Sequence, residues 1–200
     1  MKITDFAILL LVMQWAFVTV GTAKEQTGFD RRVQAEEINR IMDNVVISAL
    51  QQGYTGDRHV SAGETVPVLE ELIIADTFIS EMAFMLYGAD NAGSRQSVWE
   101  KVPCIVVIRG GQYLLYRGSV KGEWIAFSSG KHEQRVREIE KAIESCLHDR
   151  RSALSIPAGN SELYSQTLSD YAVLAVYEVT ATANLGNSGR TYILSGAAVK

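Results

Sequence analysis

The sequence has few of the residues that build metal, disulfide or catalytic sites. Its 200 residues include only two cysteines, three prolines and three histidines. His59, His132 and His148 lie far apart with no second ligand at metal spacing, and the two cysteines form no Cys-x-x-Cys pair. Nucleophile-elbow, phosphate-loop, dinucleotide and His-Glu-x-x-His motifs are missing as well. We therefore expect no catalytic residues, no cofactor and no metal, in a protein that is not an enzyme.

Basic clusters are also missing, and this excludes a nucleic-acid partner. The net charge is −4, and the pair Arg31-Arg32 is more typical of an interface than of a phosphate-binding patch. Acids at Asp57, Glu64, Glu70 and Glu71 match no calcium loop of known spacing. Ser129 and Gly130 precede an expected helix, where they are better explained as a cap than as an anion site.

One long apolar run is present, from Phe6 to Val20, and three interpretations of it stay open. It suits the core of a secretory signal peptide cleaved after Ala23, because small residues stand where the peptidase acts. It also suits an uncleaved anchor, since Ile3 to Ala23 reaches the roughly 20 residues that span a bilayer. The third interpretation is a helix held in the membrane before assembly and packed in a filament core afterwards.

The third interpretation rests on the order of the first residues, Met1 to Leu9, with Asp5 just before the apolar run. This layout resembles the N-terminus of type IV pilins, pseudopilins and tight-adherence minor pilins. The resemblance implies a membrane-anchored subunit of a bacterial secretion or adhesion apparatus, in which the acid offsets the terminal amine of a neighbouring subunit. A carboxylate in an apolar environment is costly unless it is paired. The membrane and assembly residues it implies are Asp5, Phe6, Leu9, Leu10, Leu11, Trp15 and Val20.

The charges around this run do not determine its orientation. Lys2 precedes it, while Lys24, Arg31 and Arg32 follow it, which mildly opposes an outside position for the C-terminal part. The signal-like and pilin-like features both imply export, so we expect a single-pass membrane protein with an extracytoplasmic domain. Its expected partners are the membrane and other subunits, contacted through the N-terminal helix.

An amphipathic helix is expected from Arg31 to Gln52, with Gly53 as its stop. Its apolar residues recur at the i, i+3, i+4, i+7 spacing of one buried face. They are Ile38, Ile41, Met42, Val45, Val46, Ala49 and Leu50. We expect this face to pack on the domain's own sheet, with the preceding part of the helix as a stalk.

The remaining chain, residues 53 to 200, is long enough for one domain with its own core. Tyr54 to Glu64 is expected to be a loop, Val66 to Tyr87 a deeply packed helix with Pro67 in its first turn, and Gly88 to Ser97 a second loop. Met82 and Met85 are assigned to the core. The later expected elements are strands at 102–108, 112–117 and 123–128, a helix at 131–150, and strands at 171–180 and 191–199.

This order predicts an α+β fold: a long N-terminal helix, whose membrane segment continues into the amphipathic helix, and an antiparallel sheet covered on one face by helices. The expected units are an anchor at 1–23, a stalk helix at 24–52 and a globular domain at 53–200. Cys104 and Cys146 either stay buried thiols or form a disulfide.

The alternative function is a membrane-tethered extracytoplasmic sensor or ligand-binding module that uses its sheet as a pocket. Aromatic residues in the expected strands favour it. They are Tyr113, Tyr116, Trp124, Phe127, Tyr171 and Tyr177.

Overall fold

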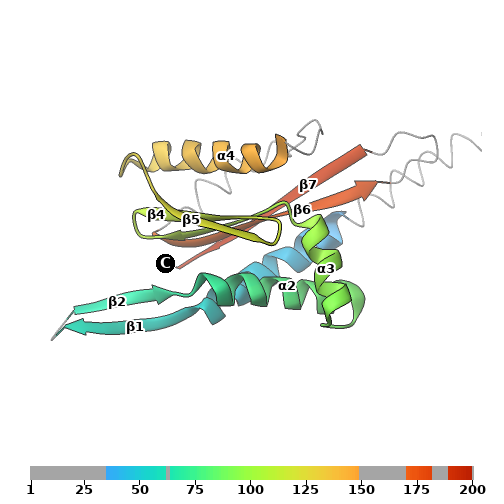
Figure 1. The fold of residues 1–200 in the computed structure, drawn as a ribbon, viewed down its shortest axis with the longest axis horizontal. Helices are drawn as coiled ribbons and strands as arrows, with labels where there is room; N and C mark the ends of the chain where they lie inside the picture. The colour runs from blue at the N-terminus through green and yellow to red at the C-terminus, as the bar shows by residue number, and fades with distance from the viewer. Residues whose placement is uncertain (1–34, 62–63, 149–169, 182–188, 200) are drawn as a thin grey trace, which may run out of the picture.

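A computed structural model describes residues 35–61, 64–148, 170–181 and 189–199 (Figure 1). Residues 35–53 form a helix, and the later elements confirm the predicted mixture of helices with an antiparallel sheet. In chain order they are β1 (Tyr54–Ser61), β2 (Glu64–Leu69), α2 (Glu71–Tyr87), α3 (Ala92–Lys101), β3 (Cys104–Arg109), β4 (Gln112–Arg117), β5 (Val120–Ala126), α4 (His132–His148), β6 (Tyr171–Ala181) and β7 (Gly189–Ala198).

Five strands form one antiparallel sheet in the order β5-β4-β3-β6-β7. The central strand β3 pairs without a break on both sides, so that Val106 has Leu115 and Leu174 as its partners. Arg109 pairs with Gln112 across the predicted hairpin turn. Gly110 there has a φ of 59°, the left-handed value that a type II′ turn requires at its first central position.

Helices cover both faces of the sheet, whereas one covered face was predicted. In β3, Ile105 and Val107 point to the core shared with α2 and the helix at 35–53, and Val106 and Ile108 point to the core under α4. Figure 1 shows α4 on one side of the sheet and the other helices on the opposite side. A strand buried on both faces is apolar at every position, so the unbroken run of β3 already indicated two cores.

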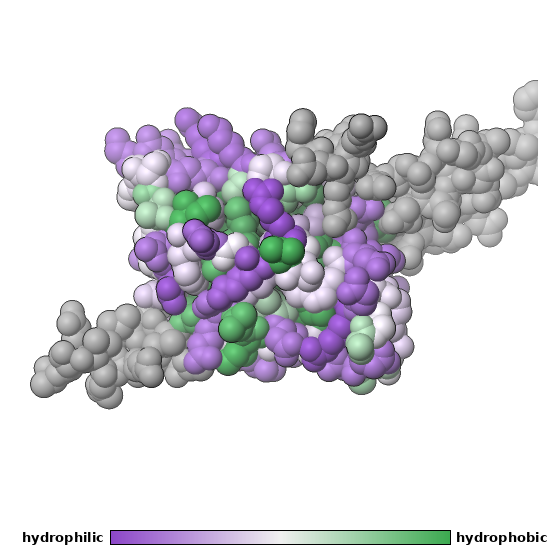
Figure 2. Space-filling model, in the orientation of Figure 1, coloured by the Kyte–Doolittle hydropathy of each residue, from purple (hydrophilic) through white to green (hydrophobic). Residues whose placement is uncertain are grey.

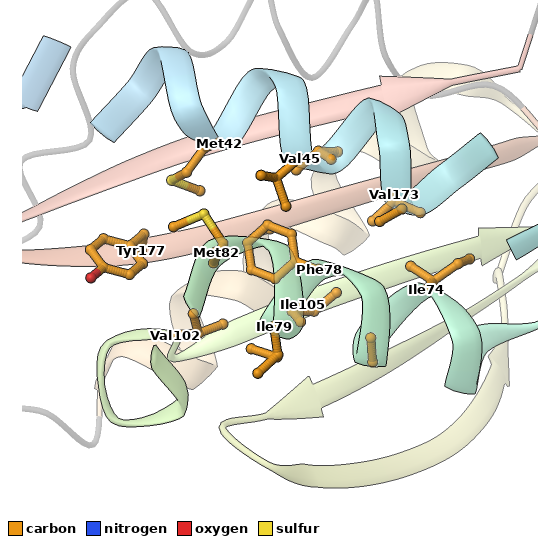
Figure 3. Packing of buried hydrophobic residues seen from close by; sticks show 14 of the residues in the cluster. Met42, Val45, Ile74, Phe78, Ile79, Met82, Val102, Ile105, Val173 and Tyr177 are labelled. Atoms are coloured by element: carbon orange, nitrogen blue, oxygen red, sulfur yellow. The ribbon is translucent and has the colours of Figure 1, made fainter. Parts of the chain in front are cut away.

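The helix at 35–53 packs its predicted apolar stripe into the first core. Met42, Val46 and Ala49 are fully buried there, and Figure 3 shows Met42 and Val45 above Phe78 and Met82 of α2. Ser195 Oγ in β7 donates a hydrogen bond of 2.5 Å to Asp43 Oδ1, which ties the helix to the sheet. The prediction that this helix packs on its own sheet is confirmed for the described residues.

Residues 54–69 form a hairpin where a loop and the start of a helix were predicted. Pro67 lies in β2 opposite Asp57, so its placement in the first turn of a helix was wrong. The residue before a proline is biased away from helical backbone, and β-branched residues favour strands. The amide of Glu70 donates to the carbonyl of Gly53 at 2.9 Å and closes the base of the hairpin, which projects from the body in Figure 1.

Residues 92–101 form α3 in a segment that was partly predicted to be a loop. Gly88 ends α2 with a φ of 69°, and α3 turns away from α2 by 102°. The side chain of Asn91 accepts hydrogen bonds of 3.0 Å from the amides of Gly93 and Ser94. Ser94 Oγ accepts from the amide of Asn91 at 3.0 Å and completes a capping box. This cap lets a largely polar segment begin a helix.

Replacing Asn91 with alanine is expected to lower the stability of the domain by about 1 kcal/mol, because two amides of α3 lose their acceptor. The melting temperature, followed by circular dichroism, should fall by about 2–4 °C. Asn91→Asp keeps an acceptor at the same place and should stay within a few tenths of a kcal/mol of the original protein. An equal loss in both variants would contradict the capping role.

Candidate interaction surface

The residues predicted to anchor the protein, Asp5 and Phe6 to Val20, lie outside the described residues. Among the residues that are described, no single helix is long and apolar enough to cross a bilayer. Only α2 and α3 taken together meet that criterion, as a pair bent by 102°. The anchor therefore stays a prediction from the sequence.

The aromatic side chains that favoured a ligand pocket in the sheet pack inside the two cores. Tyr116 and Tyr177 are almost completely buried on the face of α2, and Tyr113 packs on the other face. Burial, with a smaller contribution from Glu71, raises the pKa of Tyr116 to about 12. Burial likewise raises the pKa of Tyr177. The Trp124 ring carries the Arg109 guanidinium 4.1 Å from its centroid. Tyr113, Tyr116 and Tyr177 thus fill the interior, while Trp124, Phe127 and Tyr171 are half-buried and pack at its edge.

The other candidates for chemistry do not gather into a site in the part of the chain that the structure describes. No three His, Cys, Asp or Glu side chains there are arranged to hold a metal ion. At the loop before α4, the amide of Ser128 donates to both carboxylate oxygens of Glu138 at 3.2 Å. The amide of Lys131 donates to Ser129 Oγ at 3.1 Å. The backbone amides at this loop, which could have bound an anion, thus donate to side chains of the protein itself.

The two cysteines, for which buried thiols and a disulfide were the alternatives, both lie in the second core. Cys104 is fully buried at the start of β3, and Cys146 is almost fully buried near the end of α4. Both are thiols in the structure. The disulfide itself stays a prediction.

The most unusual surface belongs to α2, which carries large exposed apolar side chains near both of its ends as well as a buried apolar stripe. The inner side packs in the first core through Ile74, Phe78 and Met82, which are 0% exposed. We use the name α2 outer face for its four exposed large apolar residues, one in the first turn and three near the C-terminal end. They are Leu72 (62% exposed), Phe84 (59%), Met85 (54%) and Tyr87 (44%). The assignment of Met85 to the core was therefore wrong, while that of Met82 is confirmed.

A shallow hollow lies beside Phe84 and Met85 at the C-terminal end of α2. Its volume is about 380 Å³, and Ser80, Glu81 and Asp90 complete its lining. In Figure 2 the visible surface is mostly hydrophilic, with separate apolar patches, one of them on the α2 side of the molecule. Exposed apolar groups inside a polar surface are typical of protein contact sites.

Fixed charged and polar groups surround this hollow. Glu81 Oε1 accepts a hydrogen bond of 2.6 Å from Ser48 Oγ of the helix at 35–53. Asp90 accepts two hydrogen bonds from Arg95, one of them 3.0 Å long. These bonds hold the pKa of Asp90 below its usual value. Arg95 also reaches Asp76 Oδ1 at 2.7 Å. An apolar centre with a polar, internally bonded rim has the anatomy of a protein–protein interface.

The exposed face was missed because sequence periodicity shows where apolar residues lie and not what covers them. A helix that is apolar all round is normally covered on all sides. The described domain covers most of the middle of α2 but leaves large apolar residues exposed near both of its ends. The breadth of the apolar surface was the signal for a contact site.

No known protein family matches this chain. Comparison with protein-family models, with curated proteins and with solved structures finds no match.

Proposed function

We propose that this chain is a non-enzymatic, membrane-tethered subunit of a bacterial secretion or adhesion apparatus, similar to a minor pilin or pseudopilin. In this proposal the apolar run from Phe6 to Val20 anchors the protein, and the α2 outer face contacts a neighbouring subunit. The single observation that carries the contact is the exposure of Phe84 and Met85 beside a hollow with a polar rim.

The size of the exposed side chains supports a contact rather than ordinary surface variation. Single exposed apolar residues are common on soluble proteins, but aromatic residues and methionine are enriched at interfaces. Phe84, Met85 and Tyr87 stand close together at one end of α2, where burial of each would be favourable. Burying a phenylalanine or methionine side chain completely is worth about 1.5–3 kcal/mol.

The position of the helix at 35–53 supports the tether. In the sequence the apolar run ends at Val20, a short distance before this helix, and the helix is fixed to the sheet by its buried stripe. An anchor joined to such a helix would hold the whole domain in a defined orientation, as a subunit of an ordered assembly needs. In type IV pilins one helix serves in the same way as anchor and as core packing, which is the resemblance noted at Asp5.

The sensor alternative has less support. It needs a pocket over the sheet, and the aromatic side chains that suggested one are used in packing. The polar groups that line the hollow at α2 beside Phe84 and Met85 include Glu81 and Asp90, which already bind Ser48 and Arg95 of the protein itself.

Replacing Phe84 with glutamate is expected to disrupt the assembly while the domain stays folded. A charge at the centre of an interface is left desolvated, and aromatic hot spots cost 2 kcal/mol or more when they are removed, so binding should weaken by about thirtyfold or more. The measurement is chemical cross-linking of the full chain in native membranes, followed by the yield of cross-linked species of defined mass.

The matched control is Ile125→Glu. Ile125 is an exposed apolar residue of β5 that pairs with Tyr113, so it lies on the sheet face under α4 and not on the face of α2. This variant should keep the cross-linked species, and both variants should keep the melting temperature of the original protein. An unchanged cross-linking pattern with Phe84→Glu would overturn the proposed contact.

A further inference from the structure

Two cysteines from distant parts of the chain meet under α4. Cys104 is the first residue of β3 and is 0% exposed, and Cys146 lies in the last turn of α4 and is 8% exposed. Both belong to the second core, and Cys146 is close enough to Cys104 to raise the pKa of its thiol. A pair of adjacent thiols differs from a lone buried cysteine, because the two sulfur atoms can react with each other.

The secondary structure explains why the thiols meet. Alternation along β3 turns Cys104 to the same face as Val106 and Ile108, which is the face under α4. Cys146 continues the buried stripe of α4 from Ile139 and Ile143, at the spacing of one helix face.

We propose that Cys104 and Cys146 form an intramolecular disulfide by exchange with an external disulfide of the glutathione class, and that this bond locks α4 onto β3. The proposal goes beyond the assembly function and does not depend on it. It defines a redox modification site inside the domain, between two elements that pack on each other in the second core.

The exchange proceeds in two steps, in which atoms, electrons and protons are all accounted for. The thiolate of Cys146, the more exposed of the two, attacks oxidised glutathione, forms a mixed disulfide and releases one glutathione thiolate. Cys104 then loses its proton and attacks the Cys146 sulfur, which forms the protein disulfide and releases the second glutathione. Two protein thiols are oxidised, one glutathione disulfide is reduced to two thiols, and the two protons pass to the released thiolates.

The environment of Cys104 fits a thiol that reacts second, after Cys146. Its hydrogen bond to Cys146 and its burial raise the pKa of the Cys104 thiol well above its usual value, and Arg117 opposes this shift. Cys104 therefore stays a protonated thiol, which leaves the first attack to Cys146. Arg117 Nη2 donates a hydrogen bond of 2.9 Å to Ser145 Oγ, so a cation stands next to the residue before Cys146. A nearby cation favours a thiolate.

The test is oxidation of the full chain, purified in mild detergent, with a mixture of oxidised and reduced glutathione. The expected results are a mass loss of about 2 Da, for two hydrogen atoms, and one cross-linked peptide that joins Cys104 to Cys146 in a non-reducing digest. Closing a loop of about 40 residues should also raise the melting temperature by about 10 °C. Cys104→Ala and Cys146→Ala should each abolish all three changes.

Three results would overturn the proposal. They are a stable glutathione adduct on Cys146 without the mass loss, a disulfide between two chains, and full recovery of both thiols by alkylation after the oxidation. The peptide map of the unsubstituted protein decides the matter even if an alanine variant proves too unstable to purify.

Discussion

Replacing Phe78 with alanine is expected to destabilise the domain by about 3–5 kcal/mol, which is a large part of the total stability of a typical domain. Phe78 is 0% exposed and lies between the helix at 35–53 and the sheet, as Figure 3 shows. Its removal leaves a cavity that the surrounding side chains fill only in part. The melting temperature should fall by about 6–20 °C.

Phe84→Ala is the matched control, because it makes the same chemical change six positions later on the same helix. Phe84 is 59% exposed, so its loss should change the stability by no more than about 0.5 kcal/mol. Denaturant unfolding of both variants measures the difference. Equal destabilisation would contradict the division of α2 into an inner side that is covered and an outer side that is open.

Replacing Gly53 with alanine is expected to destabilise the domain by about 1–3 kcal/mol, although alanine is the better helix former. A Cβ atom at Gly53 would lie 2.2 Å from Ile74 Cγ1 and 3.2 Å from the carbonyl oxygen of Glu70. Ile74 is 0% exposed, so its side chain can yield only by moving against other residues of the core. Gly53 is thus required for the close approach of the helix at 35–53 to the start of α2.

Gly93→Ala provides the contrast, because Gly93 is also helical and its added Cβ would meet nothing closer than Asn91 Oδ1 at 3.4 Å. This variant should be neutral or more stable by up to about 1 kcal/mol. Thermal and denaturant unfolding of both variants decide the point. A Gly53→Ala protein as stable as the original would show that the contact with Ile74 relaxes at no cost.

The parts of the fold that could be predicted are those with one buried face and a regular period. The stripe from Ile38 to Leu50 and the stripe of α4 from Ile139 to Leu147 each follow the 3.6-residue repeat, and the structure buries both. The glycine pair at Gly110 and Gly111 located the β3–β4 hairpin, because only a few residue types accept the backbone of a tight turn.

The parts that could not be predicted have competing local signals. Pro67 suits the first turn of a helix as well as an outer strand, and its β-branched neighbours Thr65, Val66 and Val68 favour the strand. In α3 the apolar residues are few, and the helix depends on the cap at Asn91. The candidate interface could not be located at all, since the sequence does not show which side of α2 the domain leaves open.

The central claim, a domain held at a membrane by a retained N-terminal helix, is tested most directly by the intact mass of the native protein after carbonate extraction of membranes. The account predicts a full-length mass in the carbonate-resistant fraction. A mass that begins at Lys24, in the soluble fraction, would show that residues 1–23 are only a signal and would contradict the tethered, pilin-like subunit.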